Sequence, residues 1–227
     1  MRAVEHKEVR GSQKWIRLAV NNAPSIFNRE VRAVCNIGPD KTITWVSPLM
    51  DDDYAEYRDE DFLNRLGITL SRRPLDTFWP HRGPQWDALG RTENGSVLLV
   101  EAKANILEIL SSGTRAKEKS RRLIDNSIRE VQDFLRVDHT ICWTGKLYQY
   151  ANRLAHLYLL RELNGIDAHL LFVYFTGDKD VNGPKSIIEW ESALTVVKGV
   201  LGIGKRHRLS KYVSEVFIDV LKLKDVV

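Results

Sequence analysis

The stretch from Gly83 to Asn105 constrains the fold more than any other part of the chain. It contains a continuous apolar run at 97–100, which is typical of a β-strand buried on both faces. Glu101 and Lys103 follow at once, and side chains two residues apart on a strand point to the same face. Charges this close to a core need a charged partner or a metal ion. The sequence therefore predicts a buried strand that ends in a polar site.

A second strand precedes this one, and the turn between them decides which side chains meet. A three-residue loop at 93–95 puts Gly95 where a left-handed conformation is needed, and glycine adopts that conformation without steric cost. Asp87 then lies opposite Glu101 on one face, whereas a two-residue turn would place it opposite Ala102. We predict the three-residue loop, because two carboxylates on one face can bind a hard cation through oxygen.

Asp87, followed at a distance by Glu101-Ala102-Lys103, resembles the PD-(D/E)XK nuclease superfamily, which has the restriction-endonuclease-like fold. The resemblance covers a core of about residues 51–178. It implies an α/β fold whose mixed central sheet is flanked by helices. Here that core would carry an N-terminal elaboration, a helical insertion at 107–137 and C-terminal helices.

The same resemblance implies metal-dependent phosphodiester hydrolysis, with Mg²⁺ as cofactor and Mn²⁺ as an alternative. Asp87 and Glu101 would bind the metal together with the Ala102 carbonyl, and Lys103 would position the attacking water. DNA is the expected substrate and partner, and RNA is the alternative nucleic acid.

Residues 51–66 predict a helix, with aspartates at its start and Gly67 after its end. Asp59 falls at the centre of its apolar face and Glu56 on the flank. The resembled superfamily often takes a further metal-binding acid from this helix, so both are candidates, in that order. A solvated acidic face is the alternative interpretation.

Candidate nucleic-acid contacts lie in three places. One is the loop before the hairpin, one is the cation-rich first half of a predicted helix at 114–135, and one is a polar side of a predicted helix at 146–164. The candidates are Arg82, Arg121, Gln149, Asn152 and Arg153. A solvated surface is the alternative interpretation for each group.

The chain of 227 residues fits one domain, and its formal net charge of +4 permits a nucleic-acid partner without requiring one. Cys35 and Cys142 form neither a disulfide framework nor a zinc motif, which favours a reducing, cytoplasmic location. No apolar run has the length of a membrane span, and the N-terminus lacks a signal-peptide core, so no membrane partner is expected. A homodimer is compatible with the sequence.

The C-terminal part predicts two helices, at 187–200 and 209–223, joined by a glycine connector. The connector at 199–206 nearly matches a phosphate-binding P-loop, but Arg206 replaces the required hydroxyl and the segment follows a helix. Two rivals to a nuclease stay open from the sequence. One is an inactive nucleic-acid-binding protein on the same fold, and the other is an α/β interaction protein whose charges are structural.

Overall fold

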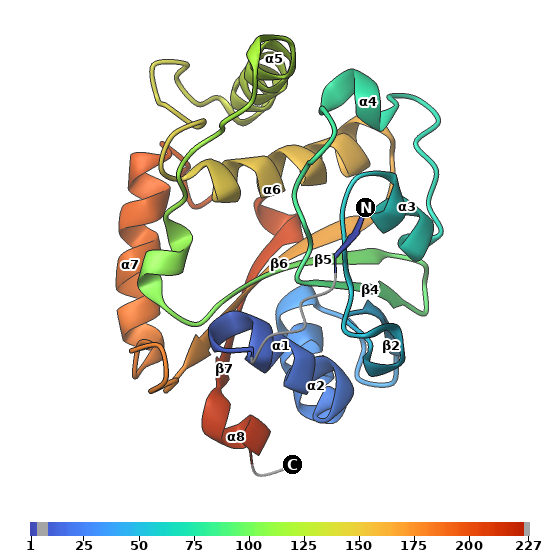
Figure 1. Cartoon of the computed structure of the whole chain (residues 1–227), viewed down its shortest axis with the longest axis vertical. Coiled ribbons are helices and arrows are strands. Elements are labelled where there is room, and N and C mark those ends of the chain that lie inside the picture. Colours follow the sequence, from blue (N-terminus) through green and yellow to red (C-terminus); the bar gives the residue numbers. More distant parts are fainter. Residues whose placement is uncertain (4–8, 225–227) are drawn as a thin grey trace.

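The computed structural model describes residues 1–3 and 9–224. Its centre is a mixed sheet with strand order β2-β4-β5-β6-β7 (Figure 1). The strands are β2 (Ile43–Ser47), β4 (Ala88–Thr92), β5 (Val97–Lys103), β6 (Ala168–Thr176) and β7 (Val213–Asp219). β4 runs antiparallel to both of its neighbours, β2 and β5, whereas β5, β6 and β7 are parallel. The predicted α/β class, with a mixed central sheet flanked by helices, is confirmed.

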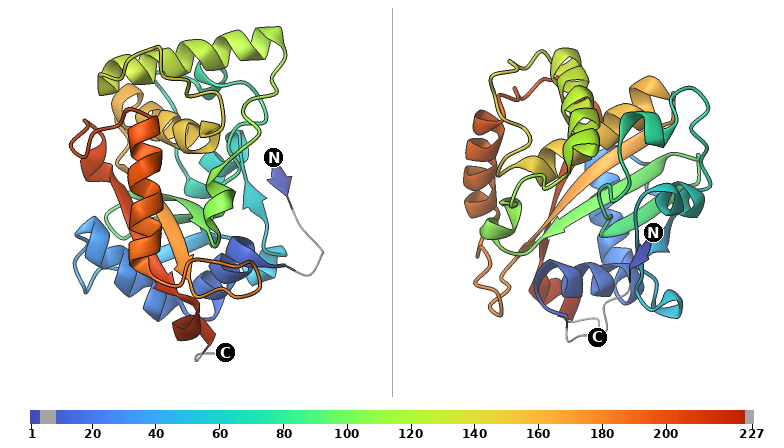
Figure 2. Two further views of the ribbon diagram at one scale, coloured as in Figure 1. Left: turned by 90° about the vertical axis from the view of Figure 1, so that its left-hand side faces the viewer. Right: turned by 45° about the horizontal axis from the view of Figure 1, so that its top comes forward.

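Helices cover both faces of this sheet (Figures 1 and 2). One face packs against α1 (Gly11–Asn21), α2 (Pro24–Cys35) and the short α8 (Val220–Lys224). The other face lies under α6 (Tyr148–Tyr158), which continues into the π-helical turn η3 (Leu159–Leu163). The long helix α5 (Glu118–Leu135) packs on α6 from outside.

Alternation along β5 explains the two cores. Leu98, Val100 and Ala102 belong to the cluster under α1 and α2, whereas Val97 and Leu99 belong to the cluster under α6. All five are fully buried, as expected for a strand covered on both faces.

Shorter elements complete the described chain. They are β1 (Arg2–Ala3), η1 (Met50–Asp52), β3 (Glu56–Tyr57), α3 (Glu60–Leu66), α4 (Leu75–Phe78), η2 (Ile106–Ile109), α7 (Ile187–Val200) and η4 (Ser210–Tyr212). β1 and β3 form a separate two-stranded antiparallel sheet. α7 confirms the helix predicted at 187–200.

Two predicted helices are wrong. The segment 51–66 is α-helical only from Glu60, because Asp53, Tyr54 and Asp59 have positive φ angles that break any helix across them. The segment 209–223 is mostly strand β7, so only α8 remains of the second C-terminal helix. Since β2 and β7 are both in the sheet, the sheet extends beyond the predicted core limits of 51–178.

None of the helices in the described residues is long and apolar enough to cross a membrane.

Candidate active site

The hairpin has the predicted register. Ala88 pairs with Val100 and Arg91 with Val97, and the loop between the strands is closed by Gly95 at φ +86°. Asp87 immediately precedes β4, and its carboxylate Oδ2 accepts a 2.6 Å hydrogen bond from the Ala102 N–H. The turn therefore brings Asp87 to the end of β5, where Glu101 and Lys103 lie.

Glu101 is clamped between two cations. Its Oε1 lies 2.5 Å from Lys103 Nζ, and its Oε2 accepts a 2.6 Å hydrogen bond from Arg153 Nε on α6. Only 2% of Glu101 is exposed. Burial opposes its ionisation, but Arg153 and Lys103 outweigh burial and hold the pKa of Glu101 below its ordinary value. Glu101 is therefore a carboxylate at neutral pH.

Arg153 is fixed on every side. It donates 2.9 Å to Asn152 Oδ1 and 2.7 Å to the Gln85 carbonyl, and its guanidinium lies 4.8 Å from the Trp86 ring centroid. Only 3% of Arg153 is exposed. The sequence assigned Arg153 to nucleic acid, but the structure pairs it with Glu101.

Asp87 has the opposite electrostatic environment. Burial raises its pKa well above the ordinary value, and the negative charges of Glu101 and Glu56 raise it further. Lys103 and the Ala102 N–H act in the other direction and do not offset this. Asp87 is thus a partly buried carboxyl group at which burial and two neighbouring carboxylates outweigh the positive charge of Lys103.

Glu56 lies near Asp87 and Glu101 as a residue of strand β3, so it comes from an extended segment and not from the predicted helix. Its oxygens accept 3.1 Å from Gln13 Nε2 and 2.9 Å from Gln85 Nε2. Burial raises its pKa, and the charge of Glu101 contributes in the same direction. Because Trp86 pairs with Tyr57, the strand that carries Glu56 lies beside the segment leading to Asp87.

Asp59 does not share this location. It precedes α3 at φ +55°, and its carboxylate accepts hydrogen bonds from the N–H groups of Arg82 (3.2 Å) and Gly83 (2.8 Å). It lines a different cavity, with Trp79 and Lys119. The order of the two candidate acids is thus reversed by the structure, because the helix that would have aimed Asp59 at the site is absent.

A cavity of about 420 Å³ opens beside these carboxyl groups. It is lined by Glu56, Pro84, Gln85, Asp87, Ser111, Tyr148, Gln149, Asn152 and Arg153. The polar side of α6 therefore faces the site as expected. The volume of the cavity lies within the range of small-ligand pockets, about 300–1,000 Å³.

The remaining predicted contacts lie elsewhere. Arg82 has φ +67° in the exposed loop held by Asp59. Arg121 pairs with Asp125 through two 2.9 Å contacts and donates 3.0 Å to Thr144 Oγ1. Neither arginine lines the cavity beside Asp87.

Sequence reasoning missed the residues that hold the acids. Gln13 and Gln85 support Glu56, and Tyr148 lines the cavity at the start of α6. Tyr148 lies at the start of the helix predicted at 146–164, so its place on that helix was available from the sequence, but its place at the cavity was not. The positions of both glutamines depend on contacts between distant segments, so no local pattern indicates them.

Comparison of the chain with protein-family models, curated proteins and solved structures finds no match. Across residues 1–3 and 9–224, no group of three or more His, Cys, Asp or Glu side chains has an arrangement suited to a metal ion. The function must therefore be argued from the site alone.

Proposed function

We propose that this protein is a metal-dependent nuclease that hydrolyses phosphodiester bonds, with DNA as substrate. The observation that supports this most is the environment of Asp87, a partly buried carboxyl group destabilised by two neighbouring carboxylates beside an open cavity. Removing a charge from water beside like charges is costly, so such an arrangement is typical of a functional site.

The residues present fit Mg²⁺. Its usual protein ligands are one or two carboxylates, with waters and substrate phosphates completing the shell, so a cluster of three acids is not required. Asp87 and Glu56 line the cavity and would hold the ion, and the Ala102 carbonyl and Glu101 would be its further oxygen donors if the ion displaced a cation from Glu101. A divalent cation would also relieve the repulsion that raises the pKa of Asp87.

When bound, Mg²⁺ would supply a Lewis acid for the phosphate and a water of lowered pKa. The chain's own groups have separate roles. Burial opposes the charge on Lys103, but Glu101 and Asp87 outweigh burial and raise its pKa, so Lys103 is an ammonium that orients groups and offsets negative charge. Arg153 is a positioning residue, because it fixes Glu101 and is itself held by Gln85 and Trp86.

One observation favours a second candidate function. Both oxygens of Glu101 are already paired, one with Lys103 and one with Arg153. That arrangement would suit a nucleic-acid-binding protein without catalysis, or an interaction protein in which the charges hold the fold together. In either case Mg²⁺ would have to compete with two cations for Glu101.

The decisive experiment is a cleavage assay with Mg²⁺ and with Mn²⁺, on linear, nicked, supercoiled and single-stranded DNA and on RNA. We expect cleavage that falls by about 10²–10³-fold in Lys103→Ala, the usual scale for losing one preorganised charge at a reacting group. Lys179→Ala, in the surface loop after β6, is the matched control and should retain full activity.

The remaining outcomes separate the candidates. Mg²⁺ binding by the wild type, measured by calorimetry, without cleavage of any substrate would favour the inactive nucleic-acid-binding protein. Folded wild-type protein that neither binds Mg²⁺ nor cleaves would leave the charges a structural role and contradict the proposal.

A further inference from the structure

A second, smaller cavity lies where α7 ends, and basic and hydroxyl side chains line it. Its volume is about 100 Å³, too small for a whole nucleotide but equal to roughly three waters, the size of one phosphate group. The polar side chains lining it are Lys198, Lys205, His207, Ser210, Tyr150 and Glu215. It is distinct from the cavity beside Asp87.

The glycine connector builds this cavity. Gly202 has φ +66°, its N–H donates to the Gly199 carbonyl (3.1 Å), and the Ile203 N–H donates to the Lys198 carbonyl (2.9 Å). This pair of bonds is the Schellman ending of a helix. The positive φ favours glycine at this position, and a Cβ there would also displace the end of the Ile141 side chain. The near match to a P-loop is thus a helix ending, and it turns the chain so that Lys205 lines the same cavity as Lys198.

The charge around the cavity is strongly positive. Residues 205–211 contain four Lys and Arg and no acid, which equals the formal net charge of +4 for the whole chain. Lys198 Nζ is paired with Glu215 Oε1 at 2.6 Å, whereas Lys205 has no ion-pair partner in the part of the chain that the structure describes. An anion in this cavity would meet at least one uncompensated ammonium group.

His207 adds a second indication of a ligand. Its Nδ1 is buried and has no hydrogen-bond partner among the described residues, and an unsatisfied buried polar atom is costly. Burial lowers the pKa of His207, and the charge of Lys198 lowers it further. A bound anion would give the imidazole a partner and favour its protonated form.

The cavity lies close to the candidate active site. Glu101, Phe172 and Glu215 are partners in register across β5, β6 and β7, so they share one face of the sheet. Two strand spacings separate the outer pair, roughly 10 Å. Tyr150 stacks on Phe172 with 4.3 Å between ring centroids, and it lines both this cavity and the small gap beside Glu101.

We propose that this cavity binds a phosphate group, either a phosphate of a nucleic acid or that of a free mononucleotide or phosphate ion. Lys205 and Lys198 supply the charge, and Ser210 and His207 supply hydrogen bonds. The proposal goes beyond the nuclease function and does not need cleavage at Asp87 to hold, so the two can fail separately.

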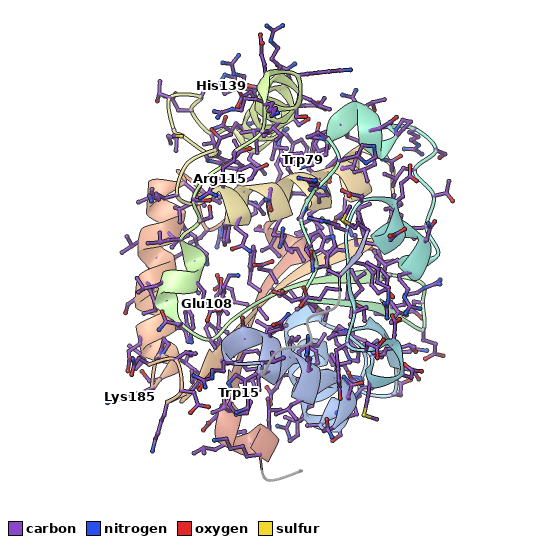
Figure 3. All side chains as sticks on the ribbon, viewed as in Figure 1. Trp15, Trp79, Glu108, Arg115, His139 and Lys185 are labelled. Atoms are coloured by element: carbon purple, nitrogen blue, oxygen red, sulfur yellow. The ribbon has the colours of Figure 1, made fainter. Side chains whose placement is uncertain are left out.

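The test is a titration of the wild-type protein with inorganic phosphate, followed by NMR of the His207 imidazole, against chloride at equal ionic strength. Phosphate should raise the pKa of His207. Lys205→Ala should weaken phosphate binding about tenfold or more, since a charge-assisted hydrogen bond is lost. Lys185→Ala is the matched control, because Lys185 lies before the opposite end of α7 (Figure 3), and it should change nothing.

Glu215→Gln is a variant that should strengthen phosphate binding instead of weakening it. Removing this carboxylate frees Lys198 and removes a like charge, so phosphate should bind several-fold more tightly. The proposal is overturned if phosphate shifts His207 no more than chloride does, or if Glu215→Gln and Lys205→Ala bind as the wild type does.

Three further titrations identify the source of the phosphate. An oligonucleotide with a 5′-phosphate, the same oligonucleotide without it, and a mononucleotide are compared through the same His207 signal. A shift only with the terminal phosphate or the mononucleotide assigns a monoester, and a shift with the unphosphorylated oligonucleotide assigns the nucleic-acid backbone.

Discussion

The two faces of the central sheet are made by the same strands but differ in kind. Towards α1 and α2, strand β5 presents only the apolar side chains Leu98, Val100 and Ala102. Towards α6, the same strand begins with Val97 and Leu99 and ends in Glu101 and Lys103. A 420 Å³ cavity opens on that side.

This difference shows how one sheet can combine stability with an energetically costly site. The α1–α2 face gains free energy from close apolar packing alone. The α6 face buries an ion pair, which contributes little net stability when intact but costs much when broken. Asp87 and His156, whose pKa values burial shifts strongly, both lie on the α6 side.

The largest expected effect is on Glu101. Glu101→Gln leaves Lys103 and Arg153 without their carboxylate, so we expect the free energy of unfolding to fall by about 3–5 kcal/mol. Urea denaturation at pH 7 measures this change in the free energy of unfolding. On the other face, Leu98→Ala should cost about 2–5 kcal/mol through its cavity and leave Mg²⁺ affinity unchanged. A loss below about 1 kcal/mol for Glu101→Gln would mean that the buried pair does not hold the two layers together.

The next effect is the acid sensitivity of the α6 face. Burial lowers the pKa of His156 to about 3, from an ordinary value near 6.5. As the pH falls from 6.5 towards 3, the unfolded chain binds a proton that the folded chain does not, so stability falls by up to about 1.4 kcal/mol per pH unit.

His156→Phe should remove this part of the pH dependence, because the side chain sits among Phe62, Trp79 and Trp86. Urea denaturation of the wild type and of His156→Phe between pH 7 and pH 4 measures the pH dependence of the free energy of unfolding. Leu98→Ala is the control from the apolar face and should keep the wild-type slope. Equal slopes for wild type and His156→Phe would contradict the burial of a neutral imidazole.

The smallest expected effect is a gain in stability. Since the pKa of Asp87 is raised in the folded state, its favourable contribution exists below the ordinary carboxyl pKa and is lost as the pH rises through the raised value. Asp87→Asn removes the free-energy cost of keeping a charged carboxylate at this position at neutral pH. The amide oxygen of the variant can still accept a hydrogen bond from the Ala102 N–H.

We therefore expect Asp87→Asn to raise the melting temperature at pH 7 by about 2–4 °C, corresponding to about 1 kcal/mol. The gain should disappear below about pH 4 and be accompanied by loss of Mg²⁺ binding. A variant that melts lower than the wild type at pH 7 would assign Asp87 a structural role.

The hairpin could be predicted from the sequence because its rules are local. Alternation along a strand and the conformational need met by Gly95 fixed the register without knowledge of any other segment. The class of fold was implied by the resemblance that Asp87, Glu101 and Lys103 carry, and the mixed sheet flanked by helices confirms it at the level of the class.

The failures have two physical causes. The apolar residues Phe62, Leu63 and Leu66 do form a helix, but the pattern was extended backwards across residues whose backbone turns left-handed. The segment that forms β7 was predicted to be a helix, although Val216 and Ile218, two residues apart, both point into the core as in a strand.

The candidate site shows the limit of local patterns. Arg153, one of the two ion-pair partners of Glu101, lies 52 residues away on α6. One hydrogen bond to Glu56 comes from Gln13, which lies 43 residues earlier. Such contacts follow from tertiary packing, which no window of sequence contains. The acids could be found from the sequence, but their environment could not.

The three-residue turn at 93–95 has a consequence for how this gene can change length. If the strands re-paired one residue out of register, every side chain on one arm of the hairpin would reverse its orientation, and Asp87 would point towards α1 and α2. Because both arms are buried, the pairing of Ala88 with Val100 resists such a slip, and an inserted residue is accommodated by a longer loop. Natural descendants of this sequence that keep the site should therefore vary in the length of the loop and not in the pairing of the strands.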